Sequence, residues 1–167
     1  MHSLTQIPGL PKAEAYREIR TSLASLFSGE PSGLANAANM AAVLFQTLPE
    51  LNWAGFYFLQ DADLVLGPFQ GKVACVRIGL GRGVCGTAAQ SLETVIVPDV
   101  AAFPGHIACD SASRSEIVVP LIQSGRLLGV LDLDSPRKAR FDQTDADGLE
   151  AAVELLLRSS EFGRLAG

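Results

Sequence analysis

The chain contains 167 residues, a length typical of one domain. Its 13 basic and 18 acidic side chains give a net charge of −5. This balance argues against nucleic acid or an anionic membrane as the main partner, because both attract basic surfaces. With 48% hydrophobic and 19% charged residues, the composition excludes a disordered chain. The cysteines, Cys75, Cys85 and Cys109, are odd in number, which excludes a fully paired secreted disulfide framework.

The N-terminal segment, residues 1–12, lacks both the basic start and the apolar run of a signal peptide. No window of the chain approaches the about 18 consecutive apolar residues that a transmembrane helix needs. We therefore expect a cytoplasmic protein, in which thiols stay reduced and disulfides are usually transient or catalytic.

Apolar residues at helical spacing predict three long helices, at residues 11–27, 32–48 and 144–162. In the second helix, this spacing places Leu34 and Phe45 on the buried face. Thr144 and Asp147 stand at the spacing of a capping box, which predicts the start of the third helix.

Between the second and third of these helices the apolar period changes to two, which predicts strands. The predicted strands are residues 52–59, 64–66, 73–78, 94–97, 116–123 and 127–134. A short helix is expected at residues 84–91, and residues 99–115 form a long irregular segment of a kind that is often functional. Helices that flank an antiparallel sheet indicate an α+β domain.

The glycine-rich residues 79–86 superficially resemble a phosphate-binding loop, but they lack its Gly-Lys-[Ser/Thr] and do not complete a dinucleotide fingerprint. We interpret them as a tight turn, which places Cys85 near a helix N-terminus, where backbone dipoles favour a thiolate. The cysteine spacings of 10 and 24 match no common zinc finger, so no metal is expected. His106, three residues before Cys109, is expected to raise thiolate character nearby.

The last predicted strand carries Asp132 and Asp134, which alternation places on one face. If the preceding hairpin has a three-residue loop, Glu116 lies opposite Asp134 and joins this face. A two-residue loop shifts the register by one and removes Glu116 from it. Clustered carboxyl groups repel one another as anions, so at least one pKa should rise. Solvated carboxylates at the strand ends are the alternative.

Trp53 and Tyr57 are four residues apart on a predicted strand, so their side chains share a face. This spacing is compatible with ordinary core packing. It is also compatible with an aromatic wall for a small apolar group or a cation.

Five segments of the chain are similar to the free methionine-(R)-sulfoxide reductase family, whose members are single GAF domains. They are residues 52–57 (NWAGFY), 67–71 (GPFQG), 83–86 (GVCG), 103–110 (FPGHIACD) and 131–135 (LDLDS). The resemblance spans about residues 11–161 and includes the cysteine spacing. It implies one GAF-like domain over residues 1–167, with a central antiparallel sheet flanked by helices. It also implies reduction of free L-methionine (R)-sulfoxide without a bound cofactor, NADPH-linked thioredoxin as reductant, and a homodimer with the first helix at the interface.

Within this family pattern, Cys109 corresponds to the nucleophile, Cys75 to the resolving cysteine and Cys85 to an auxiliary thiol. Which of Cys75 and Cys85 resolves the intermediate stays open. The substrate-binding residues implied by the resemblance are Trp53, Tyr57, Glu116, Asp132 and Asp134. Thiol chemistry agrees: a thiolate attacks the sulfoxide sulfur while a carboxylic acid, Glu116 or Asp134, protonates the oxygen. The resulting sulfenic acid condenses with a second thiol, and an external dithiol reduces the disulfide.

A non-catalytic GAF sensor that binds a small ligand and signals through a partner is the main alternative. No part of the sequence has the pattern of an output domain or a long coiled coil. A reductase of peptide-bound methionine sulfoxide is a third reading, but an acid cluster that binds an ammonium group favours a free amino acid.

Overall fold

The computed structural model describes residues 9–163, so most of the segment judged not to be a signal peptide lies outside the described residues. The elements in chain order are α1 (Lys12–Phe27), α2 (Gly33–Thr47), β1 (Trp53–Gln60), β2 (Asp63–Gly71), β3 (Arg77–Gly79), α3 (Gly83–Ser91), β4 (Val95–Val97), a 3-10 helix (Val100–Ala102), β5 (Ser115–Gln123), β6 (Arg126–Ser135) and α4 (Gln143–Ser159). The strands form one antiparallel sheet in the order β3-β2-β1-β6-β5-β4. The predicted α+β class is confirmed.

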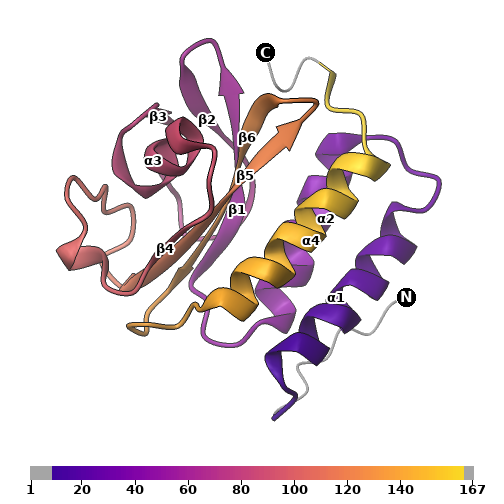
Figure 1. Cartoon of the computed structure of the whole chain (residues 1–167), viewed down its shortest axis with the longest axis horizontal. Helices are drawn as coiled ribbons and strands as arrows, with labels where there is room; N and C mark the ends of the chain where they lie inside the picture. The colour runs from indigo at the N-terminus through magenta and orange to yellow at the C-terminus, as the bar shows by residue number, and fades with distance from the viewer. Residues whose placement is uncertain (1–8, 164–167) are drawn as a thin grey trace.

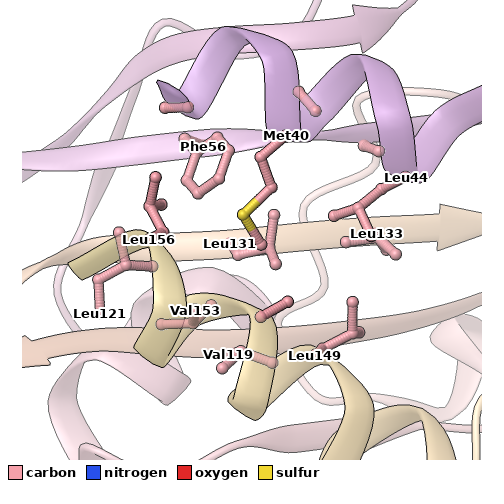
Figure 2. Packing of buried hydrophobic residues seen from close by; sticks show 14 of the residues in the cluster. Met40, Leu44, Phe56, Val119, Leu121, Leu131, Leu133, Leu149, Val153 and Leu156 are labelled. Carbon is pink, nitrogen blue, oxygen red and sulfur yellow. The ribbon is translucent and has the colours of Figure 1, made fainter. Parts of the chain in front are cut away.

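The sheet separates two layers of unequal size (Figure 1). On one face α2 and α4 pack against the strands and α1 packs outside them, whereas α3 and the long segment after β4 cover the other face. Each face has its own hydrophobic cluster. Figure 2 shows the larger one, to which α2, α4 and the central strands contribute Met40, Leu44, Phe56, Leu131, Leu149 and Leu156. Burial of one such side chain stabilises the fold by about 1.5–3 kcal/mol, so the helical face anchors the sheet and leaves the other face available for chemistry.

The β5–β6 hairpin differs from the prediction in its turn and agrees with it in its register. Ser124 and Gly125 form a two-residue turn with φ of 52° and 74°, as a tight hairpin turn with two left-handed residues requires. A β-bulge next to the turn then shifts the pairing by one residue, at Leu128. The bulge compensates for the short turn, so Glu116 pairs with Asp134 as a three-residue loop would have arranged it.

The β2 strand is longer than predicted, and the strand predicted at residues 73–78 is largely absent. Pairing with β1 continues to Gly71 because a register irregularity opposite Phe56 accommodates Pro68, a residue that strand interiors normally exclude. Only Arg77–Gly79 pair as β3. Residues 72–76 are therefore a connecting segment, and Cys75 lies in it.

The helical predictions are correct in position but wrong in three details. In α2 the buried face carries Met40 and Leu44, whereas Leu34 is 47% exposed. This helix is rich in alanine, so apolar residues occur on every side and the pattern did not define one face. The α4 helix is capped two residues earlier than expected, by Asp142 with Asp145 in place of Thr144 with Asp147. It ends at Ser159, three residues before the predicted end.

Asp145 has a second role as the centre of a buried polar network that joins α1 to α4. Its carboxylate accepts hydrogen bonds from Lys12 Nζ at 2.6 Å, Tyr16 Oη at 2.9 Å and Arg140 Nη1 at 3.2 Å. The side chain is fully buried. Two cations and a phenol therefore replace the water that this carboxylate loses on folding.

Candidate active site

Three carboxyl groups meet on the face of the sheet that α3 covers: Glu116 of β5 and Asp132 and Asp134 of β6, here called the acid cluster. Glu116 pairs with Asp134 across β5 and β6, and Asp134 pairs with Trp53 across β6 and β1. The predicted sharing of one face is therefore confirmed. These pairs place acidic and aromatic side chains next to each other on three adjacent strands.

The pKa values of the acid cluster are all raised, as expected for carboxyl groups that share a buried site. Burial is the largest cause in each case, and neighbouring carboxylates add to it. For Glu116 the pKa rises to about 8, although a hydrogen bond with Asp132 acts in the opposite direction. At neutral pH the cluster therefore holds protons that it can donate.

Within residues 9–163, the acid cluster has one ion-pair neighbour, His106, whose Nε2 lies 3.4 Å from Glu116 Oε2. Burial lowers the pKa of His106, so its imidazole is mainly neutral near pH 7 and does not neutralise the cluster. Oδ1 of Asp132 is buried and has no hydrogen-bond partner among these residues. The cluster thus contains acceptor capacity that the described protein does not satisfy.

Beside the acids lies an aromatic wall of Trp53, Tyr57 and Phe69. The rings of Trp53 and Tyr57 are 5.9 Å apart, and those of Trp53 and Phe69 are 5.3 Å apart, both pairs stacked. Gly55 permits this packing, because a Cβ there would lie 2.3 Å from Phe69 Cβ. The shared face of Trp53 and Tyr57 is as predicted, whereas no spacing in the sequence indicates that Phe69 joins them.

The polar ends of the wall hold the segment that carries Cys75. Trp53 Nε1 donates to the carbonyl of Lys72 at 3.1 Å, and Tyr57 Oη donates to the carbonyl of Cys75 at 3.0 Å. The aromatic side chains therefore both line the site and position a cysteine next to it.

A disulfide joins Cys75 to Cys109, with 6.1 Å between their Cα atoms. It links the β2–β3 connection to the long segment before β5. Cys109 is exposed and Cys75 half-buried, so external thiols can reach the bond. Cys85 is free and buried.

Cys85 does not have the thiolate environment that its place near the N-terminus of α3 predicted. Burial, followed by the charges of Asp132 and Glu116, raises its pKa well above the usual value. Its Sγ lies 4.0 Å from Glu116 Oε1, to which the thiol donates. Desolvation and two acidic neighbours outweigh the helix dipole here, so the prediction for Cys85 is wrong.

Asn52 is part of the site through contacts that no sequence pattern indicated. Its Nδ2 donates to Asp110 Oδ2 at 3.1 Å and to Ser113 Oγ at 3.0 Å, and its backbone N–H donates to the carbonyl of Asp134. The residue after Cys109 is thereby tied to the strand end that carries Asp134.

A cavity connects these groups, and seven of the eight predicted site residues line it: Trp53, Tyr57, Cys85, Cys109, Glu116, Asp132 and Asp134. The eighth, Cys75, follows the lining residue Ala74. The cavity volume of about 30 Å³ suffices for about two water molecules, since one needs about 10–15 Å³. In this disulfide-bonded form the covering segments therefore close over the acid cluster.

Comparison with known proteins identifies the family. Residues 35–157 match the family model described as a GAF domain. The free methionine-R-sulfoxide reductase of Escherichia coli is 49% identical over 154 residues, which cover 90% of this chain and 93% of that protein. This chain belongs to the free methionine-(R)-sulfoxide reductases. It is therefore an oxidoreductase with a GAF fold.

Solved structures agree with this assignment. The free methionine-R-sulfoxide reductase of Neisseria meningitidis, solved in complex with its substrate, is 47% identical, with a TM-score of 0.89 and 95% coverage of both chains. A protein of Burkholderia vietnamiensis described as a candidate GAF sensor is 55% identical, with a TM-score of 0.88 over 90% of this chain and 96% of that one. The predicted GAF fold and reductase family are thus confirmed.

Among the residues that the structure describes, one group in this reductase has ligand atoms close enough to hold a metal ion: Cys85, Glu116 and Asp132, within 4.8 Å of one another. The pKa values of all three groups are raised, so a metal ion would have to displace their protons.

Among residues 9–163, no helix has both the length and the apolar character that a membrane span requires.

Proposed function

We propose that this chain reduces free methionine (R)-sulfoxide to methionine, with Cys109 as the nucleophile. The observation that carries the proposal is the Cys75–Cys109 disulfide, accessible at Cys109, at the edge of a cavity lined by carboxyl groups of raised pKa and by an aromatic wall. Sulfoxide reduction requires a thiol, a proton donor and a binding site for the substrate, and these groups can supply all three. The family membership supports the same reaction.

The acid cluster and the aromatic wall suit the two ends of a free amino acid. A carboxylate of the cluster can bind the substrate ammonium. The ammonium then supplies the positive charge that no described side chain provides next to the acid cluster. The stacked faces of Trp53 and Tyr57 can hold the S-methyl group. An acid cluster that binds an ammonium group favours a free amino acid over a residue within a peptide, whose nitrogen is uncharged.

The chemical step begins with attack of the Cys109 sulfur on the sulfoxide sulfur. The sulfoxide oxygen is transferred to Cys109 with proton assistance, so methionine leaves and Cys109 becomes a sulfenic acid. Glu116 is the favoured proton donor, because a pKa of about 8 keeps it protonated at neutral pH and close to the optimum for proton transfer. Asp134 remains the second candidate, as predicted.

Cys75 completes the catalytic cycle as the resolving cysteine. Its thiol condenses with the Cys109 sulfenic acid, releases water and forms the Cys75–Cys109 disulfide. An external dithiol, which we expect to be NADPH-linked thioredoxin, then returns both cysteines to thiols. Cys85 is an auxiliary thiol in this scheme, since its raised pKa disfavours attack as a thiolate.

The decisive measurement is NADPH oxidation in a thioredoxin-coupled assay with free methionine (R)-sulfoxide. Cys109→Ser should abolish turnover, and full turnover by this variant would falsify the nucleophile assignment. Cys75→Ser should still release one methionine per chain in a single turnover but should not sustain coupled turnover, whereas Cys85→Ser should sustain it. A GAF sensor would bind ligand without oxidising NADPH.

Disulfide mapping by mass spectrometry after one substrate equivalent separates the two candidate resolving thiols. A Cys75–Cys109 product in the wild type and in Cys85→Ser is the expected result. Formation of a Cys85–Cys109 product in the wild type would assign resolution to Cys85 instead.

Three broader expectations accompany this proposal. Residues 1–167 form one GAF domain that acts without a bound cofactor, and its compartment is the cytoplasm, where the thiol pool can reduce the disulfide. The protein is a homodimer with α1 at the interface. Light scattering that shows a monomer at micromolar concentration would contradict the dimer.

A further inference from the structure

The surface beside the disulfide carries two exposed valine side chains. Five large hydrophobic side chains are exposed in the described part of the chain, and two of them flank Cys75: Val73, 86% exposed, and Val76, 65% exposed. Val73 also shares the lining of the cavity with Cys109, so this apolar surface extends to the exposed side of the disulfide. Exposed apolar side chains next to a reactive disulfide offer a contact for a protein that must approach it.

The same surface is basic although the chain carries a net charge of −5. Residues 64–92 contain no Asp or Glu, but they contain Lys72, Arg77 and Arg82. Acids from other segments contact two of these cations only at long range: Asp110 lies 3.7 Å from Lys72, and Asp63 lies 3.8 Å from Arg77. Both cations are themselves exposed and their ion pairs are long, so they remain available to a partner.

We propose that this docking surface, formed by Lys72, Val73, Val76, Arg77 and Arg82, binds the protein dithiol that reduces the Cys75–Cys109 disulfide. The partner is a dithiol oxidoreductase with apolar surface next to its nucleophilic cysteine and acidic residues around it. The inference rests on the proposed function, because only a catalytic disulfide needs reduction in every cycle. It goes further by assigning the partner's position and chemistry.

Cys109 is the more exposed half of the disulfide, so the partner's thiolate attacks its sulfur and not that of Cys75. A mixed disulfide forms with Cys109 Sγ, and Cys75 leaves as a thiolate that takes up a proton. The partner's second thiol then attacks the mixed disulfide, which releases reduced Cys109 and the oxidised partner. Two electrons and two protons pass from the dithiol to the two cysteines.

The test compares a protein dithiol with a small one. Turnover of free methionine (R)-sulfoxide is measured with reduced thioredoxin and, separately, with dithiothreitol, which needs no docking surface. Val76→Glu should lower kcat/KM for thioredoxin by about tenfold, the loss expected when a contact worth more than about 1 kcal/mol is replaced by a repelling charge. The dithiothreitol-supported rate should remain within about twofold of the wild type, because electrostatic changes at a docking surface act on protein association.

Further variants test the contribution of charge and the dependence on position. Arg77→Glu should lower kcat/KM for thioredoxin at low salt, and this effect should shrink as ionic strength rises. Leu34→Glu and Arg126→Glu make matched changes at exposed positions outside the docking surface and should alter neither rate.

The outcomes separate this inference from the proposed function. Unchanged thioredoxin kinetics in Val76→Glu, or an equal fall with both reductants, would overturn the docking surface. Absence of turnover by the wild type with either reductant would instead overturn the reductase proposal.

Discussion

Asp145 and the acid cluster differ in how the surrounding protein compensates a buried negative charge. Asp145, on the helical side of the fold, accepts hydrogen bonds from Lys12, Arg140 and Tyr16. The acid cluster, on the other face of the sheet, has only the largely neutral His106 as an ion-pair neighbour among residues 9–163.

This difference distinguishes a structural carboxylate from a functional one. The Asp145 network neutralises its charge within the protein and ties α1 to the start of α4. The acid cluster keeps raised pKa values and, among residues 9–163, an oxygen of Asp132 without a hydrogen-bond partner, and both features reduce the stability of the ionised protein. Such groups are suited to proton donation and to binding a cation from outside.

Substitutions that remove one member of this comparison should have their largest effect on catalysis. Glu116→Gln removes the favoured proton donor, so turnover of free methionine (R)-sulfoxide should fall by about 10²–10⁴, the usual contribution of a general acid. Steady-state kinetics with dithiothreitol measures this effect independently of any protein reductant. Asp134→Asn is the matched variant, and a full rate in either variant removes that residue as the donor.

Asp145→Ala should affect stability and leave the chemistry intact. This variant removes the buried carboxylate that pairs with Arg140 and Lys12, so the free energy of unfolding should fall by about 3–5 kcal/mol, as for other broken buried ion pairs. Urea unfolding at constant pH measures the loss. Turnover per folded molecule should be unchanged, and an exposed variant such as Glu18→Gln should have little effect on either quantity.

A change to the substrate tests the cation proposed for the acid cluster. N-acetylation of methionine sulfoxide removes the ammonium charge, and loss of a charged hydrogen bond worth about 1.5–3 kcal/mol should lower kcat/KM by about 10–150-fold. Comparison of free and N-acetylated (R)-sulfoxide provides the measurement. Equal kcat/KM values for the two substrates would rule out ammonium recognition by the cluster.

The last expected effect is a pH dependence of stability. The pKa of Glu116 rises from 4.5 on the unfolded side to about 8 in the folded protein. Protonated Glu116 therefore makes its full contribution to the free energy of unfolding below about pH 4.5. This contribution is lost as the pH rises to about 8, at up to about 1.4 kcal/mol per pH unit. Urea unfolding between pH 5 and pH 8 should show a shallower decline for Glu116→Gln than for the wild type. An unaltered slope would contradict the raised pKa.

Sequence patterns predicted the parts of the site that depend on local geometry. Alternation alone placed Trp53 with Tyr57 and Asp132 with Asp134, because side chains two or four residues apart on a strand share a face. Prediction failed where neighbours distant in sequence decide the outcome. The thiol environment of Cys85 depends on Glu116 and Asp132, which approach it only after the sheet and α3 have packed together.

By itself, the sequence determined the fold class, the two faces of the strands and a cysteine pattern shared with the reductase family. Only the tertiary structure decided that Glu116 joins Asp134, since the bulge at Leu128 compensates for the two-residue turn. It also decided that Cys75, and not Cys85, is joined to Cys109. The physical reason is the same for both: strand register and sulfur proximity depend on contacts between distant segments, whereas periodicity reports only which way a local side chain points.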